Sequence, residues 1–406
     1  MDHAPAPAFS TIGGLPAGPL RWLLTILAVV FIAATLAVGF YIVNPCNIDA
    51  GPSAAARKTL IFPLRALVVS LVAGLLAAIA CWGRARLAAT GFVLVAVLAT
   101  ATTGFSIARM WPLAIEQNVA VSLISHFGMN KHASVLPSRV SRDVVYGRAA
   151  DGTELALDVW PATTPTQTTR RPAFIRLHGG AWVHGAKSDL PNWNNWLNEL
   201  GYVVFDVEYR MPPPARWKEE IGDVKCALGW VVGNAEKYGI DASRISIMGY
   251  SAGANLAMLA AYSADSAALP PSCAAPRVQI KSVVNLYGFS DLALAHENSL
   301  SPTYLRDVLR RYVGGPVSEF PDRYKLLSPT AYISAKAPPT ITFLGLSDRI
   351  IAREQVERLD QALQLAGVGH ETYMLPGADH GFDENWGAMS TEFARQMVKR
   401  FLDRYG

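Results

Sequence analysis

The chain has 406 residues, of which 51% are hydrophobic and only 17% charged, with a mean hydropathy of +0.22. This composition excludes a wholly disordered chain, and it argues against one soluble globule, because soluble domains usually carry about 25% charged residues. The net charge of +4 is unevenly placed: residues 1–110 hold seven Lys or Arg and two acids, and the remainder holds 29 basic and 30 acidic residues. The larger part is therefore nearly neutral, which argues against a nucleic-acid-binding surface.

Three apolar stretches in the first 110 residues are each close to the roughly 20 residues that a helix needs to cross a membrane. They run over Trp22–Val43, Leu60–Trp82 and Leu87–Ala108, with their charges at or near the ends. Three such stretches in succession argue against buried core helices, and the length of the first argues against a cleaved signal peptide. We predict a membrane anchor of three transmembrane helices over residues 1–110, and hence a multi-pass membrane protein.

The charges of this anchor do not determine its orientation. Each arrangement places three positive residues on the cytoplasmic side: Arg21, Arg84 and Arg86 with the N-terminus inside, or Arg57, Lys58 and Arg109 with it outside. Because the positive-inside rule works by counting these residues, it leaves the side of the larger domain undetermined.

The four cysteines give no clear signal. Cys46 and Cys81 fall at opposite ends of the membrane spans, Cys226 falls within a predicted helix, and Cys273 lies in a proline-rich loop. No pair has the spacing of a zinc site or of a redox motif. The sequence therefore predicts no metal site and does not reveal the redox compartment.

Residues 111–138 form a linker with weak apolar periodicity, after which short β-branched or aromatic runs alternate with helix-like segments. This alternation is typical of a mostly parallel sheet, and we predict one α/β domain over residues 139–406. The predicted strands are Asp143–Gly147, Glu154–Trp160, Ala173–His178, Tyr202–Tyr209, Arg244–Met248, Ser282–Tyr287, Thr340–Gly345 and Glu371–Leu375. The predicted helices are Pro191–Leu200, Trp217–Tyr238, Ala252–Ser263, Thr303–Tyr312, Arg353–Ala366 and Thr391–Arg404.

A G-x-S-x-G motif, Gly249-Tyr250-Ser251-Ala252-Gly253, stands between a predicted strand and the helix that follows it. In this context a sharp turn exposes the serine hydroxyl above the sheet. The string alone is a weak signal and could be a plain structural turn. Its position between strand and helix favours Ser251 as a nucleophile.

A second motif, His178-Gly179-Gly180-Ala181-Trp182, directly follows the predicted strand Ala173–His178. Small residues allow backbone amides to approach the oxyanion that develops when a carbonyl is attacked. The two motifs together, in this order along the chain, are more specific than either alone.

With these motifs the chain resembles the α/β-hydrolase fold, and more narrowly the esterases and lipases related to hormone-sensitive lipase, including the carbohydrate-esterase-like branch. The resemblance covers roughly Ser141–Gly406 and implies an eight-stranded sheet with helices on both faces. It also implies an oxyanion hole formed by the amides of Gly180, Ala181 and Ala252. Ala181 stands where the commoner form of the motif has a third glycine, and His178 is expected to hold the loop rather than to act as the base.

A serine hydroxyl is a weak nucleophile until a base takes its proton. His380 follows the last predicted strand in a glycine-containing loop, so we predict that it is the base. Asp348 lies just beyond the strand Thr340–Gly345 and is the predicted carboxylate that orients the imidazole. Asp379, next to His380, and Asp291, after the preceding strand, are the rival acids. The order Ser251, Asp348, His380 is that of the α/β-hydrolase fold.

The substrate pocket is predicted to include Trp182, His184 and Tyr250. An aromatic cluster near the oxyanion motif fits pocket lining and plain core packing equally well; its members are Trp182, Trp193, Trp196 and Tyr209.

The favoured function is a membrane-anchored serine hydrolase that cleaves small-molecule carboxylic esters through an acyl-enzyme, without a metal or an organic cofactor. The alternatives are an amidase or peptidase on the same scaffold, including a formamidase, and a catalytically silent binding module. The intact predicted triad argues against the silent module. The sequence does not reveal the natural substrate, the acyl chain length, the alcohol group or the oligomeric state.

Overall fold

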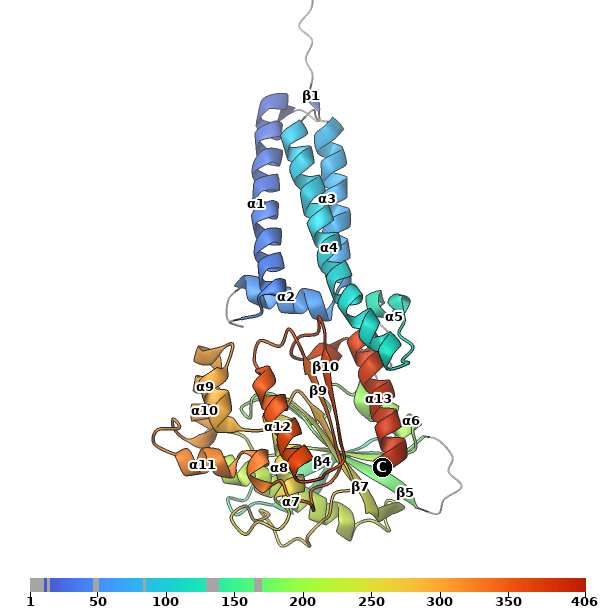
Figure 1. Cartoon of the computed structure of the whole chain (residues 1–406), viewed down its shortest axis with the longest axis vertical. Helices are drawn as coiled ribbons and strands as arrows, with labels where there is room; N and C mark the ends of the chain where they lie inside the picture. Colours follow the sequence, from blue (N-terminus) through green and yellow to red (C-terminus); the bar gives the residue numbers. More distant parts are fainter. Residues whose placement is uncertain (1–10, 13–14, 47–50, 83–84, 129–138, 164–169) are drawn as a thin grey trace, which may run out of the picture.

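The computed structural model describes residues 11–12, 15–46, 51–82, 85–128, 139–163 and 170–406. A helical anchor stands at one end of an α/β domain, and the two regions meet through α2 and the lower part of α4 (Figure 1). A two-stranded hairpin, β1 (Thr11–Ile12) and β2 (Leu15–Pro16), precedes the first long helix.

In the described part of the chain, three helices are long and apolar enough to cross a membrane: α1 (Ala17–Val43), α3 (Leu64–Trp82) and α4 (Arg86–Glu116). Large side chains point outward, with Leu71 75% and Leu87 81% exposed, whereas Ala28, Ala73 and Ala88 are buried. Small residues between helices and large aliphatic residues outside are typical of helices packed in lipid.

The second predicted span begins later than expected. Leu60 and Ile61 close a separate helix, α2 (Gly51–Ile61), which runs along the base of the anchor next to the α/β domain (Figure 1). Pro63 explains the break, because proline has no backbone N–H and cannot continue a helix. The prediction that the span starts at Leu60 is therefore wrong, and α3 starts at Leu64.

The third span is longer than expected, since α4 continues past Ala108 to Glu116. Met110 and Ala114 on this extension are buried in the same apolar core as the sheet. The short helix α5 (Leu123–Phe127) then packs on α13 (Met389–Tyr405). Residues 129–138 of the predicted linker lie outside the described residues. Residues 111–128 of the expected linker are thus attached to the domain.

Among the described residues, eight strands form one sheet in the order β10-β9-β8-β7-β5-β6-β4-β3. Neighbouring strands are parallel except at β4, which pairs antiparallel with both β3 and β6. Their bounds are β3 (Ser141–Arg148), β4 (Glu154–Trp160), β5 (Arg171–Leu177), β6 (Val203–Val207), β7 (Ile240–Tyr250), β8 (Val283–Leu286), β9 (Thr340–Gly345) and β10 (His370–Leu375). All eight predicted strands are present, and the predicted α/β fold class is confirmed.

The six predicted helices of the domain are also present, and shorter helices occupy segments without clear periodicity. The predicted ones are α6 (Asn192–Glu199), α7 (Trp217–Gly233), α8 (Ala252–Tyr262), α10 (Pro302–Val313), α12 (Arg353–Leu365) and α13. The others are α9 (Leu292–Asn298), α11 (Pro321–Leu326) and the 3-10 turns η1 (Pro329–Tyr332) and η2 (Phe382–Glu384).

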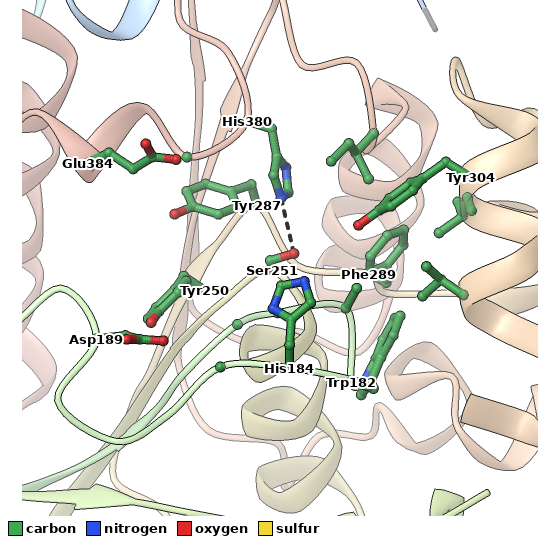
Figure 2. Close-up of a pocket in the computed structure, with 18 of the residues that line it drawn as sticks. Trp182, His184, Asp189, Tyr250, Ser251, Tyr287, Phe289, Tyr304, His380 and Glu384 are labelled. Atoms are coloured by element: carbon green, nitrogen blue, oxygen red, sulfur yellow. Dashed lines mark hydrogen bonds between the residues drawn. The ribbon is translucent and has the colours of Figure 1, made fainter. Parts of the chain in front are cut away.

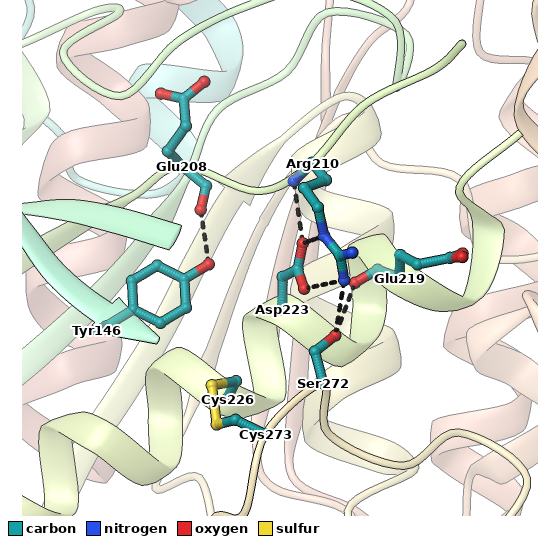
Figure 3. The surroundings of a disulfide bond; sticks show 8 residues. All are labelled: Tyr146, Glu208, Arg210, Glu219, Asp223, Cys226, Ser272 and Cys273. Carbon is teal, nitrogen blue, oxygen red and sulfur yellow. Dashed lines mark hydrogen bonds and ion pairs between the residues drawn. A yellow bond between two sulfur atoms is a disulfide. The ribbon is translucent and has the colours of Figure 1, made fainter. Parts of the chain in front are cut away.

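A disulfide joins Cys226 in α7 to Cys273 in the loop after α8, with the two Cα atoms 5.5 Å apart (Figure 3). Beside it, Arg210 forms a two-point ion pair with the buried Asp223 and donates to the Ser272 hydroxyl. The sequence does not predict this pairing, because 47 residues separate the cysteines and no local pattern brings them together.

Candidate active site

The predicted site residues gather at one edge of the sheet. The loops that follow β5, β7, β9 and β10 carry the oxyanion motif, Ser251, Asp348 and His380 respectively. These four strands are parallel, so their carboxyl ends meet at the same edge, where ligands bind in open α/β sheets.

Ser251 occupies a strained turn between β7 and α8. Its backbone has φ 55° and ψ −122°, a conformation that costs energy for a residue with a Cβ and that is typical of functional sites. Gly253 allows the turn to pack on the oxyanion loop, because a Cβ there would lie 2.2 Å from the carbonyl oxygen of His178. The close approach of two backbones thus brings the two motifs together.

The His380 ring connects Ser251 to Asp348. Its Nε2 is 3.0 Å from Ser251 Oγ (Figure 2), and its Nδ1 is 2.8 Å from Asp348 Oδ2. The other carboxylate oxygen, Oδ1, accepts the backbone N–H groups of Ile350 and Ile351, each at 2.8 Å. An imidazole that donates Nδ1–H to the carboxylate presents the unprotonated Nε2 to the serine hydroxyl, which is the tautomer that a general base requires.

The two rival acids have other partners. Asp291 caps α9, accepting the N–H of Leu294 at 3.0 Å, and forms an ion pair with Arg358. Asp379 pairs with the buried Arg349 and accepts the backbone N–H of His380 at 2.7 Å. The structure therefore gives the His380 ring Asp348 as its carboxylate partner, and the role of Asp348 as the catalytic acid stays a prediction.

The oxyanion loop also departs from ordinary backbone geometry. Gly180 has φ +107°, and a Cβ there would lie 1.8 Å from the carbonyl oxygen of His184. Ala181 and Trp182 have φ 55° and 59°, in the left-handed region that disfavours residues with a Cβ. Ala181 in place of the commoner glycine therefore adds backbone strain, beyond the reduced room expected from the sequence. The use of these amides as an oxyanion hole stays a prediction.

His178 holds this loop from behind. Its ring is buried, stacks on Tyr209 with centroids 4.2 Å apart, and its Nδ1 lies 2.8 Å from the Gly179 carbonyl oxygen. Burial lowers the pKa of His178 to about 4, so the ring is neutral near pH 7 and Nδ1 can donate to that carbonyl. This agrees with the structural role expected for His178.

Ser251 lies in a cavity of about 460 Å³. Trp182, His184 and Tyr250, the predicted pocket residues, all line it (Figure 2). The remaining members of the aromatic cluster pack elsewhere: Trp193 is buried against Trp196 and Trp386, and Tyr209 lies behind His178. The cluster is thus divided between pocket lining and core packing.

Several lining residues were not predicted. One wall of the cavity is apolar and includes Phe289, Leu305 and Val308, the last two from α10. On another side of His380, Glu384 and Tyr287 border the cavity (Figure 2). Arg57, from α2 of the anchor, also lines it. No local motif marks Arg57, which the sequence presents only as a charge at the end of a membrane span.

The buried carboxylate of Asp383 holds Tyr287, which borders the cavity beside His380. Asp383 accepts the Trp193 indole N–H at 2.7 Å and also bonds to the hydroxyl of Tyr287, whose ring lies 4.7 Å from that of His380. Burial raises the pKa of Asp383.

Among the described residues, no group of three or more His, Cys, Asp or Glu gathers as a metal site.

The sheet order, the serine turn and the Ser–His–Asp hydrogen bonds define this protein as an α/β hydrolase. Residues 157–363 match the BD-FAE family, and the chain belongs to that family. The resemblance to esterases of the hormone-sensitive lipase group is likewise confirmed.

Three relatives illustrate these similarities. The esterase LipQ of Mycobacterium tuberculosis is 34% identical over 247 residues, which are 59% of this chain and 57% of LipQ, so the chain spans less than two thirds of that relative. Mouse (Mus musculus) hormone-sensitive lipase is 28% identical over 155 residues, 36% of this chain and 20% of that protein. A truncated carbohydrate esterase from gut microbiota superposes with a TM-score of 0.54 at 25% identity, covering 66% of this chain and 96% of the esterase.

Proposed function

We propose that this protein is a membrane-anchored serine hydrolase that cleaves carboxylic esters. The observation that carries the proposal is the hydrogen-bonded series Ser251–His380–Asp348, with distances of 3.0 and 2.8 Å. Ser251 and His380 line a cavity that could hold the substrate. Membership of the BD-FAE family and similarity to proteins named as esterases support ester hydrolysis as its reaction.

In the proposed reaction, Ser251 Oγ attacks the ester carbonyl while His380 Nε2 takes the hydroxyl proton. The amides of Gly180, Ala181 and Ala252 stabilise the oxyanion, and the alcohol leaves with the proton carried by His380. A water molecule then attacks the acyl-enzyme, with His380 again as the base, and releases the carboxylic acid and free Ser251. Asp348 stabilises the imidazolium that forms in both steps.

The cavity favours an ester with one apolar group. Trp182 is stacked on Tyr312 with centroids 4.6 Å apart, and it forms a rigid apolar surface together with Phe289 and Val308. A volume of about 460 Å³ lies at the small end of the range of pockets that bind small molecules.

We also propose that α1, α3 and α4 span a membrane and that the hydrolase domain lies on its oxidising side. The second part rests on the Cys226–Cys273 disulfide, since disulfides persist outside reducing compartments. Cys46 follows α1 and carries a free thiol, and its carbonyl accepts the hydroxyl of Ser53 on α2 at 2.7 Å, which places it on the domain side of the anchor. A membrane-impermeant maleimide should label Cys46 in intact cells, with Cys46→Ser as the control. Labelling that requires permeabilisation would place the domain on the other side.

The hydrolytic function is tested with the full-length protein in detergent micelles. Wild-type protein should hydrolyse short p-nitrophenyl esters faster than the matched anilides, and Ser251→Ala should reduce ester turnover at least about 10³-fold. Faster anilide turnover would indicate an amidase, and unchanged ester turnover by Ser251→Ala would refute the mechanism.

A further inference from the structure

The membrane anchor reaches the loop that carries His380. Arg57, on α2, donates from Nε to the backbone carbonyl of His380 at 3.0 Å, across 323 residues of sequence. Its terminal nitrogen forms an ion pair with Glu384, whose other carboxylate oxygen accepts Lys58 Nζ at 2.8 Å. The Arg57 side chain is only 17% exposed and borders the cavity that contains Ser251.

Three further contacts connect the anchor to the catalytic loops. Asn385 donates to the carbonyl of Ile61, the last residue of α2, at 2.9 Å. Arg349, next to Asp348, donates to the carbonyl of Tyr41 in the last turn of α1 at 2.6 Å. A Cβ at Gly377 would lie 3.0 Å from the Cα of Ser106 in α4, so the His380 loop packs directly on that helix.

Little regular secondary structure fixes the His380 loop. Between the end of β10 at Leu375 and the start of α13 at Met389, the 3-10 turn η2 is the only regular element. Gly381 directly follows His380 with φ 74°, a conformation that glycine adopts without strain and that does little to fix the loop. Arg57 holds the carbonyl between these two residues.

Glu384 is ionised near neutral pH, because its pKa is lowered. Burial alone would raise the pKa of Glu384, but the positive charges of Arg57 and Lys58 outweigh burial and lower it. An ionised Glu384 fixes the guanidinium plane, and this directs Nε toward the His380 carbonyl.

We propose that Arg57 is a positioning residue of the esterase site, so that the anchor completes the active site rather than only tethering it. This inference rests on the proposed function. Arg57 acts through the His380 backbone: it keeps Nε2 within hydrogen-bonding distance of Ser251 Oγ. A displacement of about 1 Å in such a site reduces rates by about 10²-fold, so loss of this contact should lower kcat strongly.

The test uses full-length protein in lipid nanodiscs with a short p-nitrophenyl ester. Arg57→Met keeps the length and removes both polar contacts; we expect kcat to fall about 30-fold to 100-fold, with KM within about twofold of wild type. Arg57→Lys retains a cation for Glu384 but lacks the planar two-point geometry, so it should recover part of kcat. Arg65→Met is the matched control, because Arg65 stacks on Phe62 at the start of α3; it should retain wild-type kcat.

Glu384→Gln supplies a second measure. If Glu384 acts by orienting Arg57, the decreases in kcat caused by the two substitutions should not add. The double variant should then have the kcat of Arg57→Met alone. Thermal unfolding of each variant should stay within about 2 °C of wild type, which separates positioning from folding.

The proposal fails if wild type hydrolyses the ester and Arg57→Met keeps kcat within twofold. It also fails if kcat falls only in proportion to a loss of folded protein, or if Arg65→Met has the same effect. A wild-type protein that hydrolyses no ester would instead refute the proposed function itself.

Discussion

Large apolar side chains are buried in the hydrolase domain but exposed on the outside of the anchor. In the hydrolase, Trp160, Phe174 and Phe205 are fully buried around the sheet. In the anchor, leucines cover the outside and alanines lie between the helices. The difference fits a hydrolase domain that folds in water and the proposed placement of the anchor helices in lipid. The helix α2 lies between the two regions and places side chains in both.

The largest expected effect concerns the hydrolase region, where polar groups carry the chemistry. Asp348→Asn should lower kcat/KM about 10³-fold to 10⁴-fold, because the amide does not stabilise the required imidazole tautomer. Asp291→Asn should leave kcat/KM unchanged, since asparagine also caps a helix. Steady-state kinetics on a soluble ester checks both. The opposite ranking would make Asp291 the catalytic acid.

The disulfide should stabilise one region and not the other. Replacing both Cys226 and Cys273 by serine should lower the free energy of unfolding of the hydrolase domain by about 4 kcal/mol, the entropic value for a closed loop of this length. Denaturant titration followed by tryptophan fluorescence measures the change. Cys46→Ser is the control on the anchor side and should have no effect. Equal stability of the reduced and oxidised proteins would contradict the expectation.

Two leucines, one buried in the hydrolase domain and one exposed on the anchor, test this difference in packing. Leu256 in α8 is fully buried, whereas Leu71 in α3 is 75% exposed. Leu256→Ala should destabilise the hydrolase by about 2–5 kcal/mol, because it leaves a cavity. Leu71→Ala should change the stability of the anchor in lipid by less than about 0.5 kcal/mol. Unfolding curves in nanodiscs measure both changes in stability. Equal losses of stability would mean that Leu71 of α3 is packed against protein and not lipid.

Acid should lower the stability of the hydrolase domain and of the contact between α5 and α13. Burial lowers the pKa values of His126, on α5, and His178 to about 4, so the unfolded chain binds more protons than the native one between pH 6.5 and 4. The contribution of these two histidines to the free energy of unfolding should be constant above pH 6.5 and fall toward pH 4, by at most about 3 kcal/mol per histidine.

The contribution of His126 to this acid loss can be measured separately. His126 Nδ1 accepts the backbone N–H of Met389 at 3.2 Å. His126→Asn keeps an acceptor for that N–H but cannot gain a proton, so it should reduce the loss of stability in acid. Thermal unfolding between pH 4 and 7 measures it. An unchanged slope in the variant would exclude His126.

Local patterns predicted most strands and helices of the hydrolase domain, and they also placed the candidate site residues at the ends of its strands. Alternating strands and helices, and motifs that are contiguous in sequence, are sufficient to locate Ser251 and to order Asp348 and His380 after it. Pro63, which separates α2 from α3, was also visible in the sequence, but the apolar run across it masked the break.

The missed features depend on contacts between distant segments. Arg57 meets His380 across 323 residues, and Cys226 meets Cys273 across 47. A charge at the end of a membrane span looks the same whether it faces lipid headgroups or an active site. Only the packing of the anchor on the hydrolase distinguishes them.

The most direct test of the account is covalent labelling of the full-length protein with a fluorophosphonate. Peptide mass spectrometry should find the adduct on Ser251, and an ester substrate should slow its formation. His380→Ala should abolish labelling while the protein remains folded. A folded protein that hydrolyses esters with Ser251 unmodified, or with the adduct on another residue, would contradict the account.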